Sequence, residues 1–296
     1  MKNNNKFRLD VWGAITLGTI ALYALFLLYP MAYLIRQSVL DPDTGGFTLA
    51  YFTKFFSKSY YFDTLINSFK VSITATVLSI AIGTPLAYLF TIFKIKGKSV
   101  LNILIVVASM SAPFIGAYSW ILLLGRSGVI TAFFKNLGIA IPDIYGFGGI
   151  VLVMTLQLFP LVFLYAKGAL KNIDNSLIEA AENLGCSGIA CFFKVVVPLI
   201  MPTLLAAALL VFMRSFADFG TPMLIGEGYR TFPVVLYTEF INEVGGSDGF
   251  AAAIAVIAIV VTTLLVFMRS FADFGTPMLI GEGYRCLLYT SDAADD

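Results

Sequence analysis

The chain has 296 residues, of which 59% are hydrophobic and only 12% are charged. Soluble domains carry about 25% charged residues, so this chain has too little polar surface to cover a water-soluble core, and it is predicted to be an integral membrane protein. The net charge of +1 excludes a nucleic-acid-binding protein that works through a basic field. The lack of histidine excludes histidine acid–base catalysis and most histidine-ligated metal sites.

Six stretches without Asp, Glu, Lys or Arg are long enough to cross a bilayer, which takes about 20 residues. A backbone in lipid must satisfy its own hydrogen bonds, so the predicted fold class is an all-α membrane protein with six spans over residues 11–268. The predicted spans, in chain order, are 11–35, 71–93, 99–125, 144–166, 195–213 and 249–268. The first is longer than a signal-peptide core of about 7–15 residues and is expected to stay in the protein.

Lys and Arg residues indicate which side of the bilayer each connection faces. Residues 1–10 contain three of them, and the turn 94–98 contains three more without an acidic residue. An even number of spans places both segments on one side, together with 167–194. The sequence therefore predicts a cytoplasmic tail at 1–10 and both ends of the chain in the cytoplasm.

The segment between the fourth and fifth predicted spans, 170–198, is amphipathic. Apolar residues recur at helical spacing from Ile178 onward, and Gly185 and Gly188 follow them. We expect a helix, a turn that the glycines make, and a second helix. Pro198 is expected at the start of the fifth span, where its missing N–H is tolerated.

The same segment carries a spaced series: E-A-A, three residues, Gly, nine residues, then an apolar residue, one further residue, a second apolar residue and Pro. The residues at these positions are Glu179, Ala180, Ala181, Gly185, Val195, Val197 and Pro198. The series resembles the loop of permease subunits of binding-protein-dependent type I ABC importers, with valines where that family has Ile and Leu. The resemblance implies a six-helix permease domain whose loop at 170–198 fits a groove of a cytoplasmic ATPase, with Glu179 pairing a basic group there.

The resemblance also implies a location in the bacterial inner membrane and a set of partners. These are a second permease subunit or a fused second half, two cytoplasmic ATPases and an extracytoplasmic solute-binding protein. The chain itself is then expected to be no enzyme and to hold no cofactor or metal, with ATP and Mg²⁺ bound by the ATPase.

The sequence indicates the transported solute less specifically than it indicates the class of importer permease. Residues 217–240 resemble permeases for ferric iron, while polyamine, phosphonate and sulfate permeases are alternatives of the same class. A secondary transporter is the alternative from a different class, but it leaves the loop motif unexplained.

ATP hydrolysis within the chain would need a phosphate-cradling loop. The string Gly97-Lys98-Ser99 lacks the upstream glycine of such a loop, because residue 92 is Ile. A membrane hydrolase is likewise excluded, since the sequence contains neither G-x-S-x-G nor H-E-x-x-H.

Arg214 and Asp218 stand near the end of the fifth predicted span, four positions apart, which is the spacing of an ion pair on a helix. Two interpretations stay open for them. The pair is either an anchor at the membrane interface or part of an outer gate of the solute path.

Residues 209–230 recur without change at 264–285. A structural repeat stacks equivalent units, whereas this string would face one side of the membrane after the fifth span and the other side after the sixth. The tail CLLYTSDAADD at 286–296 resembles a translated sequencing adapter. We interpret 264–296 as a chimeric join with adapter read-through, a recent duplication being the alternative, and expect the natural sequence to differ beyond about residue 263.

Overall fold

The computed structural model describes residues 11–41, 45–93, 96–110, 112–139, 142–183, 185–186, 188–241 and 248–268. Within these ranges the chain is mostly helical, with one isolated β-bridge between Leu40 and Phe47 and no strand. Six of the described helical stretches are long and apolar enough to cross a membrane, which confirms the predicted fold class and number of spans. They are Trp12–Ser38, Ser59–Ile92, Pro113–Asn136, Phe147–Lys171, Gly188–Phe216 and Asp248–Met268. The predicted tail 1–10, and the predicted join from residue 269 onward, lie outside the described residues.

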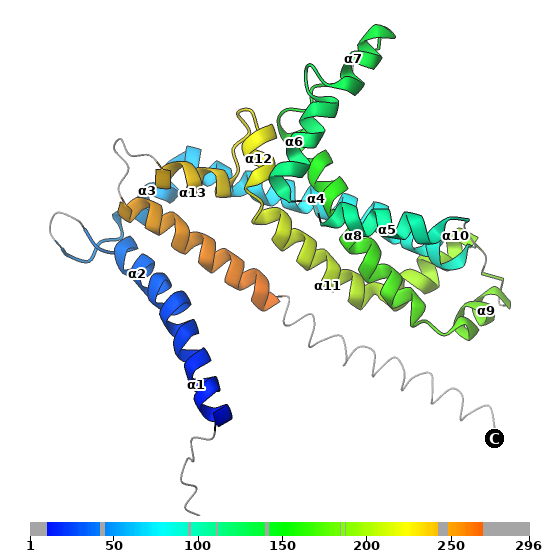
Figure 1. Ribbon diagram of the computed structural model, residues 1–296, viewed down its shortest axis with the longest axis horizontal. Coiled ribbons are helices and arrows are strands. Elements are labelled where there is room, and N and C mark those ends of the chain that lie inside the picture. Colours follow the sequence, from blue (N-terminus) through cyan, green and yellow to red (C-terminus); the bar gives the residue numbers. More distant parts are fainter. Residues whose placement is uncertain are drawn as a thin grey trace, which may run out of the picture. The chain divides into compact units, whose positions relative to one another are not determined.

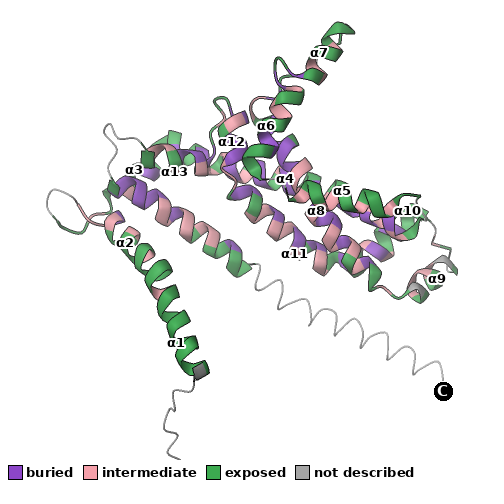
Figure 2. Ribbon diagram, in the orientation of Figure 1, coloured by how far each residue is buried: buried purple, intermediate pink, exposed green. Residues whose placement is uncertain are grey.

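The helices belong to two units, and the first comprises the described residues of 11–59 with 236–260. It contains α1 (Val11–Tyr23), η1 (Ala24–Leu28), α2 (Tyr29–Ser38) and α3 (Ala50–Ser57). Apolar side chains of α1 are exposed along its length, as Figure 2 shows, which is the pattern of a helix whose apolar surface meets lipid. Lys54 of α3 places its ammonium group 4.1 Å from the ring centroid of Phe250 in the last span.

The second unit comprises the described residues of 60–235 with 261–268. Its long helices are α4 (Ser59–Ile92), α8 (Phe147–Lys171) and α11 (Val197–Phe216), and Figure 1 shows α8 and α11 side by side. Two hydrophobic clusters stabilise this unit. One, from Ala87 and Phe90 to Val211, joins α4, α8 and α11, and the other, from Val71 to Ile225, joins α4, α6 (Pro113–Leu124), α8 and α12 (Gly220–Ile225).

The backbones of α4 and α8 approach each other closely at Gly83. A Cβ atom there would lie 2.9 Å from the carbonyl oxygen of Phe159 and 2.9 Å from Cβ of Val162. Small residues permit such close approach between membrane helices, where packing rather than hydrophobic burial drives association. Gly83 therefore fixes the distance between the two helices.

The third predicted span, 99–125, was expected to be one helix, and this is wrong. The structure has α5 (Lys98–Ser109) and then α6, which is followed by α7 (Val129–Asn136). Pro113 occupies the first turn of α6, and the preceding Ala112 is extended (φ −66°, ψ 141°). The proline ring disfavours helical backbone at the residue before it, so the uncharged run is divided into two helices at this point.

A π-helical turn precedes a proline in two of the spans. In the first, η1 ends just before Tyr29 and Pro30, and the N–H of Tyr29 donates to the carbonyl oxygen of Ala24. In the fifth, η2 (Phe192–Val196) ends just before Val197 and Pro198, and the N–H of Val197 donates to Phe192. Proline has no N–H and therefore interrupts the regular hydrogen bonds of an α-helix. A π turn beside it lets the helix continue past the interruption.

Pro198 was predicted at the start of the fifth span, and it occupies the first turn of α11. The helical path begins earlier, at α10 (Gly188–Cys191), and continues through η2 into α11 without a break. The π turn accommodates the proline, so the helix passes it. A second short helix is therefore fused directly to the span.

Candidate functional site

The predicted loop helix is α9 (Asn175–Asn183), which has defined hydrogen bonds at its start. One carboxylate oxygen of Asp174 accepts from the N–H of Ser176 at 3.0 Å, and the carbonyl oxygen of Asp174 accepts from the N–H of Leu177 at 3.1 Å. Asp174 is therefore the N-cap residue. The hydrogen bond from the backbone of Ser176 lowers the pKa of the Asp174 carboxyl below its ordinary value.

The end of α9 explains the spacing between the second alanine and the glycine. Gly185 has φ +84°, and the N–H of Cys186 donates to the carbonyl oxygen of Ala181 at 3.0 Å. This is the bond of a Schellman motif, in which a left-handed residue, usually Gly, stands four positions after the residue whose carbonyl is satisfied. The A-x-x-x-G part of the motif is thus a helix stop.

The two faces of α9 have different surroundings. Ile178 is partly buried and packs on the cluster that joins α4, α8 and α11. Glu179 and Ala180 are exposed, and Ala181 is partly buried. The helix is held to the membrane domain by one face and presents the E-A pair of the motif on the other, next to α10 and η2.

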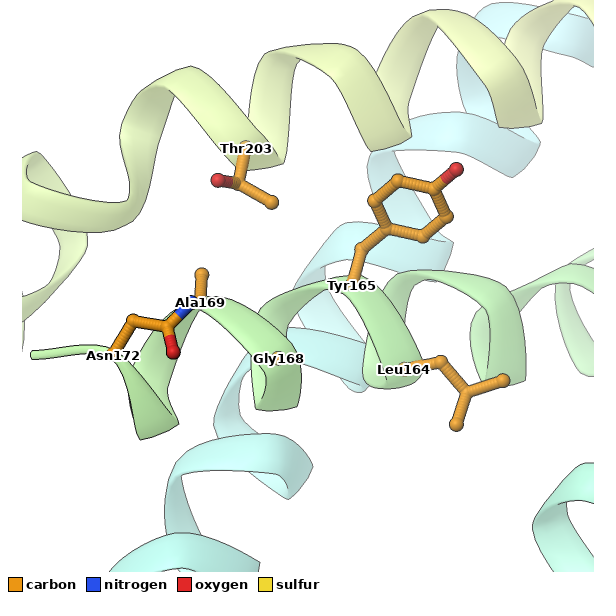
Figure 3. Close-up of a pocket in the computed structure, with 6 residues that line it drawn as sticks. All are labelled: Leu164, Tyr165, Gly168, Ala169, Asn172 and Thr203. Carbon is orange, nitrogen blue, oxygen red and sulfur yellow. The ribbon is translucent and has the colours of Figure 1, made fainter.

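A groove lies on the α8 side of this loop, between α8 and α11 (Figure 3). Its volume is about 440 Å³, and Thr203 of α11 faces residues of α8 across it. Gly168 leaves room in the wall, since nothing lies within 4 Å of its missing Cβ. The groove ends at Asn172, the C-cap of α8, and therefore adjoins the segment that leads into α9.

The predicted ion pair between Arg214 and Asp218 is wrong. Both residues lie in the described part of the chain, and no ion pair joins them there. The helix α11 ends at Phe216, so Asp218 is off the helix and the four-residue spacing no longer brings the side chains together. Asp218 instead accepts hydrogen bonds from the N–H groups of Gly220 (2.9 Å) and Thr221 (3.4 Å) and from the Thr221 hydroxyl (2.6 Å) at the start of α12.

Arg214 and Asp218 nevertheless line one pocket, with a volume of about 500 Å³. Its other walls include Gln157 of α8 and the aromatic residues Phe114 and Phe219, whose ring centroids are 5.6 Å apart. Burial raises the pKa of the Asp218 carboxyl, and the hydrogen bonds from Thr221 and Gly220 oppose this rise. The pocket lies at the end of α11 remote from α9.

One polar cluster of the described residues was not predicted. Arg126, in the turn between α6 and α7, donates to Asp143 (Nε···O 3.0 Å) and to Glu227 (N···O 2.7 Å), and its guanidinium lies over the ring of Tyr145. These residues are far apart in the sequence, so no local spacing could have revealed the cluster. The side chains are largely exposed, and we expect the ion pairs to tie three loops together with little gain in stability.

Comparison with known proteins agrees with this architecture. A family model described as "Binding-protein-dependent transport system inner membrane component" matches residues 46–275. The ferric transport system permease protein FbpB of Actinobacillus pleuropneumoniae is 27% identical over 293 residues, which is 96% of this chain. The chain covers only 41% of that relative's length. The spermidine/putrescine permease protein PotB of Haemophilus influenzae is 28% identical over 278 residues, which cover 90% of this chain and 95% of PotB.

Among solved structures, a bacterial alginate ABC transporter in complex with an alginate pentasaccharide-bound periplasmic protein has a chain of similar fold. The TM-score is 0.72 at 16% sequence identity, over 88% of this chain and 92% of that chain. This likeness shows the fold. The six apolar helices show a multi-pass membrane protein. The family model matches more than half of the chain, so the chain belongs to the inner membrane components of binding-protein-dependent transport systems.

Proposed function

We propose that the chain is the permease subunit of an ATP-driven importer and that α9 is its contact with a cytoplasmic ATPase. The observation that carries the proposal is the construction of α9. It is capped at its start by Asp174, stopped by Gly185 and anchored through Ile178, and it leaves Glu179 and Ala180 exposed. A rigid short helix with one free face suits the transmission of a partner's movement.

The partners and chemistry proposed here follow from that assignment. Two ATPase subunits bind and hydrolyse ATP with Mg²⁺, so the chain itself performs no catalysis. A second permease half completes the solute path, and an extracytoplasmic binding protein delivers the solute. The relatives support a transport role. The chain covers only 42% and 41% of the length of the ferric relatives, which supports a second half that resembles this one.

For the solute, we propose ferric iron in a complexed form. FbpB supports this choice, and PotB at equal similarity supports a polyamine as the second candidate. Phosphonate and sulfate are further alternatives within the same class of permease.

The ATPase contact can be tested by co-purification of the tagged chain, co-expressed with the ATPase and the other transporter subunits. We expect Glu179→Ala to reduce recovery of the ATPase and its stimulated activity severalfold, since a charge-assisted contact contributes about 1.5–3 kcal/mol. Glu179→Gln tests the charge alone, and Lys135→Ala on the exposed side of α7 is the control. Unchanged recovery and stimulation with Glu179→Ala would contradict the proposed contact.

The proposed orientation puts α9 in the cytoplasm and α3 on the outer side. In a chain whose cysteines are replaced by alanine, we expect Ser57→Cys to react with a membrane-impermeant maleimide in intact cells. Asn183→Cys should react only after the membrane is permeabilised. Both positions are exposed, so burial does not explain a difference between them. Labelling of Asn183→Cys from outside would overturn the orientation and the ATPase contact.

A further inference from the structure

The pocket between α6, α8, α11 and α12 contains hydrogen-bond donors that have no acceptor. Arg214 is exposed and lines this pocket, and its guanidinium makes no hydrogen bond or ion pair with the described part of the chain. The side-chain nitrogen of Gln157 is buried and likewise has no partner. Water satisfies the exposed guanidinium in the free protein, so a ligand that enters the pocket must supply an acceptor in place of that water.

The acidic residue of the same pocket does not satisfy these donors. Both oxygens of Asp218 accept hydrogen bonds at the start of α12, from Gly220 and Thr221. These bonds turn the carboxylate toward the helix terminus, where its charge faces the N–H groups. What the pocket offers to a ligand is therefore the exposed fork of guanidinium N–H groups of Arg214, whereas the buried nitrogen of Gln157 is not accessible.

We propose that this pocket binds an oxyanion, a carboxylate or phosphate group carried by the transported solute. Arginine recognises such groups in a planar, two-pronged arrangement. The pocket volume of about 500 Å³ accommodates a small organic anion. Phe114 and Phe219 supply an apolar wall for the remainder of the molecule.

This inference rests on the proposed function and reduces the range of candidate solutes. A bare polycation such as a polyamine would meet the unpaired charge of Arg214 and be repelled. Ferric iron is a hard cation that takes oxygen ligands, so a carboxylate or phosphate complex of it presents oxyanion groups to the pocket. An anionic complex therefore fits the pocket better than a free cation does.

The test uses the chain assembled with its partner subunits in nanodiscs of phosphatidylcholine. Citrate and inorganic phosphate are the oxyanion probes, spermidine is the cation probe, and binding is measured by calorimetry. We expect at least one oxyanion to bind and spermidine not to compete. Arg214→Gln should weaken that binding roughly tenfold to a hundredfold, as expected for a lost charge-assisted contact. Arg214→Lys should weaken it less, and Arg36→Gln, a change at an exposed arginine of α2, should have no effect.

Three results would overturn the proposal. They are oxyanion binding that Arg214→Gln leaves unchanged, binding of spermidine in place of the oxyanions, and displacement of citrate and phosphate by phosphatidylglycerol added to the nanodiscs. The last would assign the pocket to a lipid headgroup. ATPase recovery and activity are measured on the same preparations, so that loss of the importer assembly is distinguished from loss of the anion site.

Discussion

Gly185→Val should abolish most of the ATPase stimulation of the assembled transporter. Gly185 has φ +84°, a backbone conformation that a β-branched residue adopts only at a cost of about 1–3 kcal/mol or more. The strain falls on the stop of α9, so the hydrogen bond from Cys186 to Ala181 should be lost and the exposed face of α9 displaced. We expect a drop of at least about tenfold in stimulated ATP hydrolysis by the assembled transporter, with the membrane domain still folded.

Two variants separate this backbone effect from other causes. Gly185→Asn should retain most of the activity, because asparagine tolerates the left-handed region. Gly18→Val in α1 is the matched control, since nothing lies within 4 Å of its missing Cβ and its φ is not positive. Full stimulation by Gly185→Val would refute the role of the helix stop.

Gly83→Ala should destabilise the membrane domain. The added methyl would lie 2.9 Å from a backbone oxygen of α8, an atom that cannot rotate away, so α4 and α8 must separate. Overpacking of this kind costs about 1–3 kcal/mol, against about 1 kcal/mol that alanine gains over glycine as a helix former. We expect a lower thermal unfolding midpoint in detergent and a lower yield.

The matched control is Gly168→Ala in α8. It is the same substitution in a helix of the same unit, with nothing within 4 Å of the new methyl. It should be neutral or slightly stabilising because only the helix propensity changes. Equal midpoints for the two variants would show that α4 and α8 are not held at the distance described.

The number of spans could be predicted from the sequence because the cost of charge in lipid leaves long uncharged runs. The ends of the helices could not, since charge is tolerated near an interface. The second span starts at Ser59, well before the predicted residue 71, and includes Asp63 and Lys70. The break before Pro113 could have been predicted, because proline disfavours helical backbone at the residue before it. A search for uncharged runs does not take this into account.

In the candidate site, the features that depend on residues close in sequence could be predicted, and those that depend on distant segments could not. The helix and glycine turn around Glu179 and Gly185 depend on residues close in sequence, and the spacing predicts them. The pairing of Arg214 with Asp218 assumed a helix that continues, whereas α11 stops at Phe216 and the N–H groups of α12 compete for the carboxylate. The orphan amide of Gln157 depends on packing between distant segments, which no local pattern encodes.

The π turn at Phe192–Val196 determines how the loop segment before it is oriented relative to α11. A π turn contains one residue more than the α turn it replaces, and one residue corresponds to about 100° of rotation around a helix axis. The turn therefore sets the rotation of α10, and of the loop attached to it, around the helix axis relative to α11. Removal of one residue here would keep the helix continuous but rotate α10 by about 100° around the helix axis relative to α11. Pro198 and its π turn therefore fix the direction in which α10 and the attached loop face.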